Sequence, residues 1–300
     1  MSTILLSGAS GFIGSHLTKA LARDGHRVVR LSRKGPTSDA VAWVPESGKI
    51  DREALARARP DAVVNLAGEP IDQRWTEERK RQIRDSRVKG TALLAEALAS
   101  LADKPKTFVS GSAMGYYGAH RGDEVLEETS APGTDFLAQT AQAWERATDS
   151  AAAAGIRVVL SRTSLVLGRD GGALKRLLVP FRLGMGGRVG DGRQWMSWIA
   201  LDDAVRAMRF FIDTPALEGP VNLAAPEPVR NEEFTRVLAK VLHRPAAISV
   251  PASALELVLG QMANDTIMAS QRLSSRRLAG AGFEFQHPRL DDALRSELTR

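Results

Sequence analysis

Cysteine is absent from this chain of 300 residues. Its absence excludes disulfide bonds, thiol nucleophiles, thiolate zinc sites and iron–sulfur clusters. A folded chain of this length buries about 75% of the surface that its unfolded form exposes, so it can build a large core without such cross-links. Any chemistry must therefore come from oxygen and nitrogen side chains or from a bound cofactor.

Aromatic residues and long apolar runs are also scarce. Only 5% of the residues are aromatic, and no basic run is interleaved with them, which argues against a platform for stacking single-stranded nucleic acid. No apolar run reaches the roughly 18 residues of a membrane helix. The first 15 residues lack the basic leader of a secretion signal. We therefore expect a cytoplasmic protein that neither spans a membrane nor binds nucleic acid.

The chain carries a modest excess of positive charge, with 41 Lys and Arg against 35 Asp and Glu. Such an excess suits either nucleic acid or an anionic small ligand. The basic residues are scattered, with local clusters at residues 30–34 and 74–87. This distribution favours a phosphorylated small ligand, whereas binding to DNA or RNA would show itself by strong salt dependence.

Short apolar segments alternate with helical segments through the first half of the chain. We expect strands near residues 3–7, 27–31, 41–44, 61–67, 106–110 and 156–161, and helices near 12–23, 52–59, 76–102 and 133–154. This alternation predicts an α/β fold with a doubly wound parallel Rossmann sheet. The loops after the strand ends would then line one ligand-binding edge.

The pattern changes after residue 165, where glycine-rich loops and then short helices separated by prolines follow. We predict a dinucleotide-binding Rossmann domain over residues 1–165, to which residues 198–225 return. Residues 166–197 and 226–300 are expected to form a smaller C-terminal α+β subdomain on the substrate side.

Three glycines with the spacing G-x-x-G-x-x-G stand between the first expected strand and helix. Glycines there allow a tight turn, close approach of the backbone to a pyrophosphate and close packing of helix on strand, while the helix N-terminus supplies free N–H groups. An ordinary strand–helix turn is the alternative. The context predicts a dinucleotide site made by Gly8, Ser10, Gly11, Phe12, Ile13 and Gly14.

The second expected strand ends on Leu31-Ser32-Arg33-Lys34. In an NAD site an acidic residue here would bond the ribose 2′-hydroxyl, and this chain has none. Arg33 offers a planar fork suited to a 2′-phosphate, with Ser32 and Lys34 as helpers. The segment therefore predicts NADP(H) as the cofactor, and a solvated charge cluster is the alternative.

Further cofactor contacts are expected where the 61–67 strand ends. Small residues there would let the chain pass close beneath the cofactor, and a glycine-terminated core strand is the alternative. The candidates are Leu66, Ala67 and Gly68, together with Arg87 and Ser110.

Several motifs resemble the extended short-chain dehydrogenase/reductase superfamily. They are residues 8–14, 65–68 and 110–113, Arg162, and Trp198-Ile199 with Asp202-Asp203. Residues 115–118, 192–199, 222–228 and 282–283 are similar to motifs of an atypical group, the NAD-dependent epimerase/dehydratase-like "epimerase family protein" group with its characteristic C-terminal segment. The resemblance implies a nicotinamide cofactor and an oxidoreductase or epimerase, and it does not name the substrate.

One feature of the superfamily is missing. Its reductases use a Tyr-x-x-x-Lys pair on the helix after the serine strand, where the lysine lowers the tyrosine pKa. The corresponding residues, 136–145, contain neither tyrosine nor lysine. The chain has only two tyrosines, Tyr116 and Tyr117. One is our candidate acid, with Ser112 polarising a substrate oxygen, and the alternative is that both line the pocket wall.

Substrate contacts are expected from two further segments. The candidates are Glu69, Arg74 and Trp75 after the 65–68 turn, and Arg193 and Trp195 beside the second glycine-rich loop. In extended family members, a place similar to that of Arg193 faces a nucleotide-sugar substrate. Solvated helix faces are the alternative for the arginines. The histidines form no i, i+4 pair, so no metal site is expected.

Two functions follow from these residues. The first is an NADP(H)-binding oxidoreductase or epimerase that acts on a small polar or nucleotide-linked substrate without the usual tyrosine–lysine pair. The second is a catalytically silent NADP(H)-binding regulatory protein. A homodimer is the candidate assembly.

Overall fold

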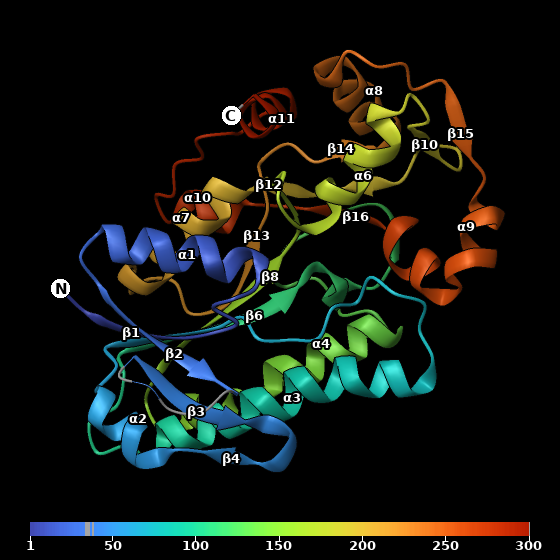
Figure 1. Ribbon diagram of the computed structural model, residues 1–300. Helices are drawn as coiled ribbons and strands as arrows, with labels where there is room; N and C mark the ends of the chain where they lie inside the picture. Colours follow the sequence, from blue (N-terminus) through green and yellow to red (C-terminus); the bar gives the residue numbers. More distant parts are fainter. Residues whose placement is uncertain (34–36, 38, 300) are drawn as a thin grey trace.

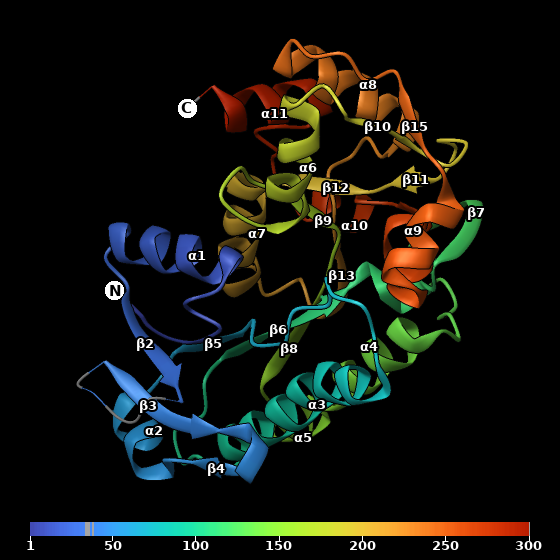
Figure 2. The same cartoon turned by 45° about the vertical axis from the view of Figure 1, so that its right-hand side comes forward.

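The computed structural model describes residues 1–33, 37 and 39–299, and its core is one large sheet (Figures 1 and 2). Eight strands lie in the spatial order β13-β8-β6-β5-β1-β2-β3-β4. They are β1 (Thr3–Ser7), β2 (Arg27–Ser32), β3 (Ala40–Val44), β4 (Lys49–Ile50), β5 (Ala62–Asn65), β6 (Thr107–Ala113), β8 (Arg157–Thr163) and β13 (Gly219–Leu223). All neighbours in this order pair in parallel except β3 and β4.

The chain runs outward from β1 in both directions, which creates a switch point beside β1. Strands β2 and β3 continue on one side and β5, β6 and β8 on the other. Open α/β sheets bind ligands at the carboxyl ends of the strands at such a point. The doubly wound Rossmann fold expected from the alternating pattern is confirmed.

The strands are apolar on both faces because helices cover both. On β1, Ile4 and Leu6 face one buried cluster and Leu5 faces the other. The helices that cover the sheet are α1 (Phe12–Arg23), α2 (Arg52–Ala58), α3 (Glu77–Ala99), α4 (Phe136–Arg146), α5 (Asp149–Ala153) and α7 (Leu201–Asp213). Helices α1 and α7 contribute to the first cluster, and α2, α3 and α5 to the second. Figure 1 shows α1 and α7 on one side of the sheet and α2 and α3 on the other.

The continuous helix expected over residues 133–154 is wrong, because the chain breaks between α4 and α5. Thr148 lies in the break, where its backbone N–H and its side-chain hydroxyl both bond the carbonyl of Glu145, at 3.1 and 2.7 Å. A threonine hydroxyl can satisfy such a carbonyl and so end a helix locally. The alanine-rich sequence hides this break because its helix propensity is continuous.

Most of the remaining elements form a second layer. Its helices are α6 (Gly172–Arg182), α8 (Asn231–Leu242), α9 (Ala252–Leu259) and α11 (Leu290–Leu298). Its strands are β7 (His120–Leu126), β9 (Leu165–Leu167), β10 (Gly187–Val189), β11 (Trp195–Met196), β12 (Trp198–Ala200), β14 (Val229–Arg230), β15 (Ile248–Val250) and β16 (Ser270–Leu273). The main core of this layer surrounds Trp198, which is fully buried among apolar side chains of α6, α8 and α11.

 The short helix α10 (Arg276–Gly280) packs through Leu278 in the first cluster of the large sheet, and the short helical turns are η1 (Pro45–Ser47), η2 (Met114–Tyr117) and η3 (Ala263–Ile267).

The two layers are interleaved in sequence. Both α7 and β13 lie within residues 198–225 and belong to the large sheet and its covering helices. The division into two domains at the boundaries given above stays a prediction. Among the residues that the structure describes, no helix is both long enough and apolar enough to cross a membrane.

Candidate functional site

The glycine loop lies at the carboxyl end of β1 and packs tightly on its neighbours. Gly8 has a φ of +67°, which favours glycine, and a Cβ there would lie 2.7 Å from the backbone of Leu66. A Cβ on Gly14 would lie 2.1 Å from the Gly8 carbonyl oxygen. Helix α1 begins at Phe12, and no side chain caps it at Gly11. Its first N–H groups are therefore suited to receive an anion.

A chain of buried polar side chains fixes the neighbouring turn. The Ser7 hydroxyl donates to Asn65 Oδ1 at 2.5 Å and accepts the N–H groups of Leu66 and Ala67. The Asn65 amide in turn donates to the Thr91 hydroxyl at 2.7 Å. The turn after β5 therefore has a fixed position against the glycine loop.

Arg87 joins this group from α3. It donates from Nη1 to the carbonyls of Glu69 and Ile83, each at 3.0 Å. Its guanidinium carbon would lie 3.0 Å from a Cβ on Gly68. Ser110, another expected cofactor contact, is fully buried, and its hydroxyl donates to the Gly111 carbonyl at 3.2 Å. The structure thus brings the glycine loop, Leu66, Ala67, Gly68 and Arg87 together.

Arg33 follows directly on β2, at the same edge of the sheet. Its guanidinium lies 3.5 Å from the Glu46 carboxylate, and the two side chains are 66% and 63% exposed. An exposed pair of this kind contributes little stability. Ser32 is the last residue of β2. Lys34, the second expected helper, lies outside the described residues.

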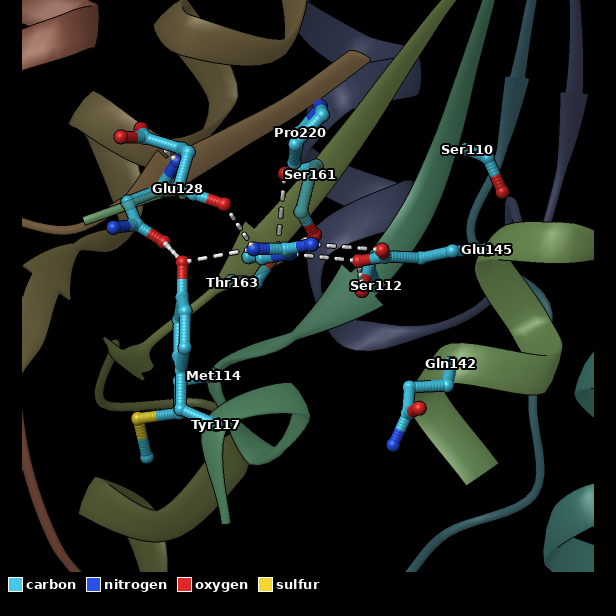
Figure 3. Close-up of polar contacts among 12 residues, drawn as sticks. Ser110, Ser112, Met114, Tyr117, Glu128, Gln142, Glu145, Ser161, Thr163 and Pro220 are labelled. Atoms are coloured by element: carbon cyan, nitrogen blue, oxygen red, sulfur yellow. Dashed lines mark hydrogen bonds and ion pairs between the residues drawn. The ribbon is translucent and has the colours of Figure 1, made fainter. Parts of the chain in front are cut away.

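Ser112, near the end of β6, belongs to a buried network with a charged pair at its centre (Figure 3). Its hydroxyl donates to Glu145 Oε1 at 2.6 Å, and Arg162 donates to both oxygens of the same carboxylate, at 2.8 and 2.9 Å. Burial by itself lowers the pKa of Arg162, but the hydrogen bonds and charge of Glu145 outweigh it and raise the pKa above its ordinary value. The network therefore keeps Arg162 charged.

The two tyrosines differ sharply in their surroundings. Tyr117 is fully buried, and its hydroxyl donates to Asn222 at 2.7 Å and accepts from Arg162 at 3.1 Å. Burial raises the pKa of Tyr117 to about 12, although Arg162 opposes this rise. Tyr116 is only partly buried, and its ring centroid lies 3.4 Å from the Arg162 guanidinium carbon. Of the two, Tyr116 is the tyrosine better placed to meet a ligand.

The first group of expected substrate contacts lies between α3 and α9. Glu69 pairs with Arg79 at 3.2 Å. Arg74 donates to the carbonyl of Leu257 in α9 at 3.3 Å. Trp75 is 8% exposed and packs edge-on against Phe136, with the ring centroids 5.2 Å apart. The Trp75 indole N–H also has a partner, the carbonyl of Ile71. The structure gives Trp75 a packing role.

The second group lies apart from the first, beside β7 and β16. The Trp195 ring has Arg230 at 4.0 Å and Arg272 at 4.5 Å from its centroid, and its N–H donates to Asp123 at 2.7 Å. The hydrogen bonds from Trp195 and Arg230 lower the pKa of Asp123. Arg193 is exposed. The structure does not bring Arg193 or Trp195 into contact with the Ser112 network.

Sequence reasoning missed Glu145 as a functional side chain. The spacing offered a signal, because it places Glu145 on the same helix face as Ala138 and Ala141. The structure shows that all three are buried. The partnership of Arg33 with Glu46 was also missed, since it depends on how β2 and β3 pair. Within the described residues, no group of three histidine or acidic side chains could hold a metal ion.

Comparison with known proteins places this chain in a family. The model of the NAD-dependent epimerase/dehydratase family matches residues 4–224. This chain belongs to that family. A second family model, a domain of unknown function (DUF1731), matches residues 250–297. The resemblance stated from the motifs, including the C-terminal segment, is confirmed.

Relatives cover the full length of the chain. An epimerase family protein of Mycobacterium leprae is 42% identical over 301 residues, which cover 100% of this chain and 96% of the relative. The crystal structure of the human epimerase family protein SDR39U1 with NADPH is 31% identical, with a TM-score of 0.88 and 99% of both chains covered. A nucleoside-diphosphate sugar epimerase structure from Corynebacterium glutamicum is 35% identical, with a TM-score of 0.82, and covers 99% of this chain and 58% of that one.

Proposed function

We propose that this protein binds NADP(H) at the glycine loop and is an oxidoreductase or epimerase for a small polar or nucleotide-linked substrate. The observation that carries the proposal is the edge of the sheet at β1 and β2. There the close-packed glycines and the uncapped start of α1 stand next to Arg33, the first residue after β2. The human relative whose structure contains NADPH supports this choice of cofactor.

Arg33 is the basis for choosing NADP(H) over NAD(H). Its partner Glu46 lies 3.5 Å away on an exposed surface. A 2′-phosphate offers two negative charges and a geometry that the guanidinium fork can bond twice. It can therefore replace Glu46 as the partner of Arg33 at little cost.

The cofactor, when bound, supplies or accepts a hydride at C4 of its nicotinamide ring. The protein's part is to orient the substrate oxygen, for which Ser112 is the candidate. Because its hydroxyl proton is given to Glu145, the Ser112 oxygen is free to accept a hydrogen bond from a substrate hydroxyl. Arg162 holds Glu145 by two bonds, so the carboxylate keeps its position if Ser112 turns toward a substrate carbonyl. Tyr116 is the candidate proton donor.

The catalytically silent alternative also has an observation in its favour. Tyr117 is buried and doubly hydrogen-bonded, and α4 offers no tyrosine or lysine. A protein could retain the cofactor site and lack turnover with this arrangement. The two functions predict the same cofactor binding and differ in turnover.

Turnover assays separate the two functions. NADPH absorbance would be followed with a panel of carbonyl compounds, and proton NMR would detect epimerised products from nucleotide sugars. We expect turnover of at least one substrate, and we expect Ser112→Ala to lower it by about 100-fold without changing the dissociation constant of NADPH. The control is Ser161→Ala on the neighbouring strand β8. The Ser161 hydroxyl forms a hydrogen bond with the Thr163 hydroxyl and has no other hydrogen-bond partner among the described residues.

Tight NADPH binding without any turnover across both panels would contradict the enzyme and support the silent protein. Failure of the unmodified protein to bind NADPH would contradict both.

A further inference from the structure

Arg87 is a largely enclosed cation that forms no ion pair with a carboxylate of the described residues. Its Nη1 donates to two backbone carbonyls, those of Glu69 and Ile83. The centroid of the Trp144 ring lies 5.2 Å from the guanidinium carbon. In the described part of the chain, its Nε and Nη2 make no hydrogen bond. Three N–H donors of the fork therefore remain for a ligand.

The charge of Arg87 is poorly compensated by the protein. Burial lowers its pKa to about 10, while the charge of Glu69 raises the pKa and that of Arg79 lowers it. The Glu69 carboxylate is itself engaged by Arg79 at 3.2 Å. Arg87 thus remains a cation at neutral pH, at a cost to the stability of the unliganded fold.

The position of Arg87 indicates which ligand group could pair with its guanidinium. Gly68 separates its guanidinium from Leu66 and Ala67, and these two residues lie against Gly8 of the glycine loop. A side chain at Gly68 would come within 3.0 Å of the guanidinium, so the glycine keeps this approach open. Arg87 therefore stands on the β5 side of the loop, and Arg33 stands on the opposite side, after β2.

We propose that Arg87 is an anchor for the pyrophosphate of the bound dinucleotide, a proposal that rests on the proposed cofactor binding at this loop. The uncapped start of α1 supplies N–H groups on one side of the pyrophosphate, and the free edge of the Arg87 fork supplies charged donors on the other. Arg33 meets the 2′-phosphate. Arg87 and Arg33 thus bind two different groups of one cofactor, the pyrophosphate and the 2′-phosphate.

Ligand fragments separate the two arginines. The test compares NADPH and NADH with ADP-ribose, which has the pyrophosphate without the 2′-phosphate, and with adenosine 2′-monophosphate, which has the 2′-phosphate without the pyrophosphate. Calorimetry should show that Arg87→Gln weakens NADPH, NADH and ADP-ribose alike, by about tenfold or more. Binding of adenosine 2′-monophosphate should not change. Arg84→Gln, an exposed arginine on the same helix, is the matched control.

Thermal unfolding provides a second readout. Removing a poorly compensated charge should leave the melting temperature of the unliganded Arg87→Gln variant equal to or above that of the wild type. The increase in melting temperature on adding NADPH should be smaller in the variant. A merely structural arginine would give the reverse, a lower unliganded melting temperature with unchanged affinity for ADP-ribose.

Unchanged binding of ADP-ribose and NADPH by a folded Arg87→Gln variant would overturn the proposal. If that variant does not fold, Arg87→Lys decides the question, because it keeps the charge and loses the fork. Weaker ADP-ribose binding by the lysine variant supports the anchor, and unchanged binding overturns it. Failure of the unmodified protein to bind any dinucleotide is a different result, which would contradict the proposed function itself.

Discussion

Arg162 contacts more of the candidate active site than any single sequence motif suggested. It donates to both carboxylate oxygens of Glu145 and to the Tyr117 hydroxyl, and its guanidinium stacks on the Tyr116 ring. Breaking a buried ion pair by removing one partner typically costs about 3–5 kcal/mol, because the remaining charge is uncompensated. The ion pair therefore holds the Glu145 carboxylate in place, and the Ser112 hydroxyl donates to that carboxylate. This arrangement is the same for either of the two functions.

The Tyr117 hydroxyl gives the stability of the fold a dependence on pH. Because burial raises its pKa from 10.0 to about 12, the folded state holds this proton more tightly than the unfolded chain. The resulting stabilisation is fully present below pH 10 and is lost as the pH rises toward 12. Tyr117→Phe removes this contribution.

Denaturant unfolding of wild type and Tyr117→Phe at two pH values checks this effect. Between about pH 9 and about pH 11, the wild type should lose about 1 kcal/mol more unfolding free energy than the variant. Near neutral pH the variant should be less stable by about 1–3 kcal/mol, because Asn222 and Arg162 each lose a partner. Parallel pH profiles for the two proteins would contradict the buried, protonated hydroxyl.

At this scale the sequence located the glycine loop and did not distinguish the two candidate tyrosines. The structure shows why positions 8 and 14 need glycine, because a Cβ at either position would collide with neighbouring backbone atoms. The difference between Tyr116 and Tyr117 could not be predicted, since adjacent residues have the same sequence context. It depends on Asn222 and Arg162, which come from two other strands.

At the scale of elements, the packing of α1 on its own loop leads to a testable consequence. A Cβ at Gly14 would lie 2.1 Å from the Gly8 carbonyl oxygen, a backbone atom that cannot turn away. Gly14→Ala should therefore destabilise the protein by about 1–3 kcal/mol and weaken NADPH binding by about tenfold or more.

Gly280→Ala is the control for Gly14→Ala. No heavy atom lies within 4 Å of a Cβ at Gly280, so its stability should change by less than about 1 kcal/mol in either direction. Thermal unfolding and NADPH titration of both variants measure the difference. Equal behaviour of the two variants would contradict the close packing of the glycine loop.

The sequence predicted the strands of the large sheet well, because each is a short apolar segment between polar turns. Strands β1, β2, β3, β6 and β8 lie where the apolar runs indicated. Helix ends were harder to predict, as the break at Thr148 shows. Helix propensity sums the preferences of neighbouring residues, so it does not predict a helix end that depends on one side-chain hydrogen bond.

At the scale of the whole molecule, the second layer contacts the start of α1 through residues 168–172. Glycines of residues 168–172 lie directly on the Phe12 ring at the start of α1. Beside them, His16 lies 2.9 Å from Asp170. Burial raises the pKa of Asp170, but the hydrogen bond and charge of His16, together with a backbone hydrogen bond and the charge of Arg169, lower the pKa overall. The second layer is therefore packed against α1, the helix that follows the glycine loop.

The central claim is that this chain binds NADP(H) and reads its 2′-phosphate with Arg33. The most direct test is calorimetric titration of NADPH and NADH into the wild type, Arg33→Asp and the control Arg27→Asp, an exposed arginine at the opposite end of β2. We predict that the wild type binds NADPH at least about tenfold more tightly than NADH. Arg33→Asp should weaken NADPH binding more than NADH binding, and Arg27→Asp should change neither. Equal affinities in the wild type, or equal losses in Arg33→Asp, would contradict the claim.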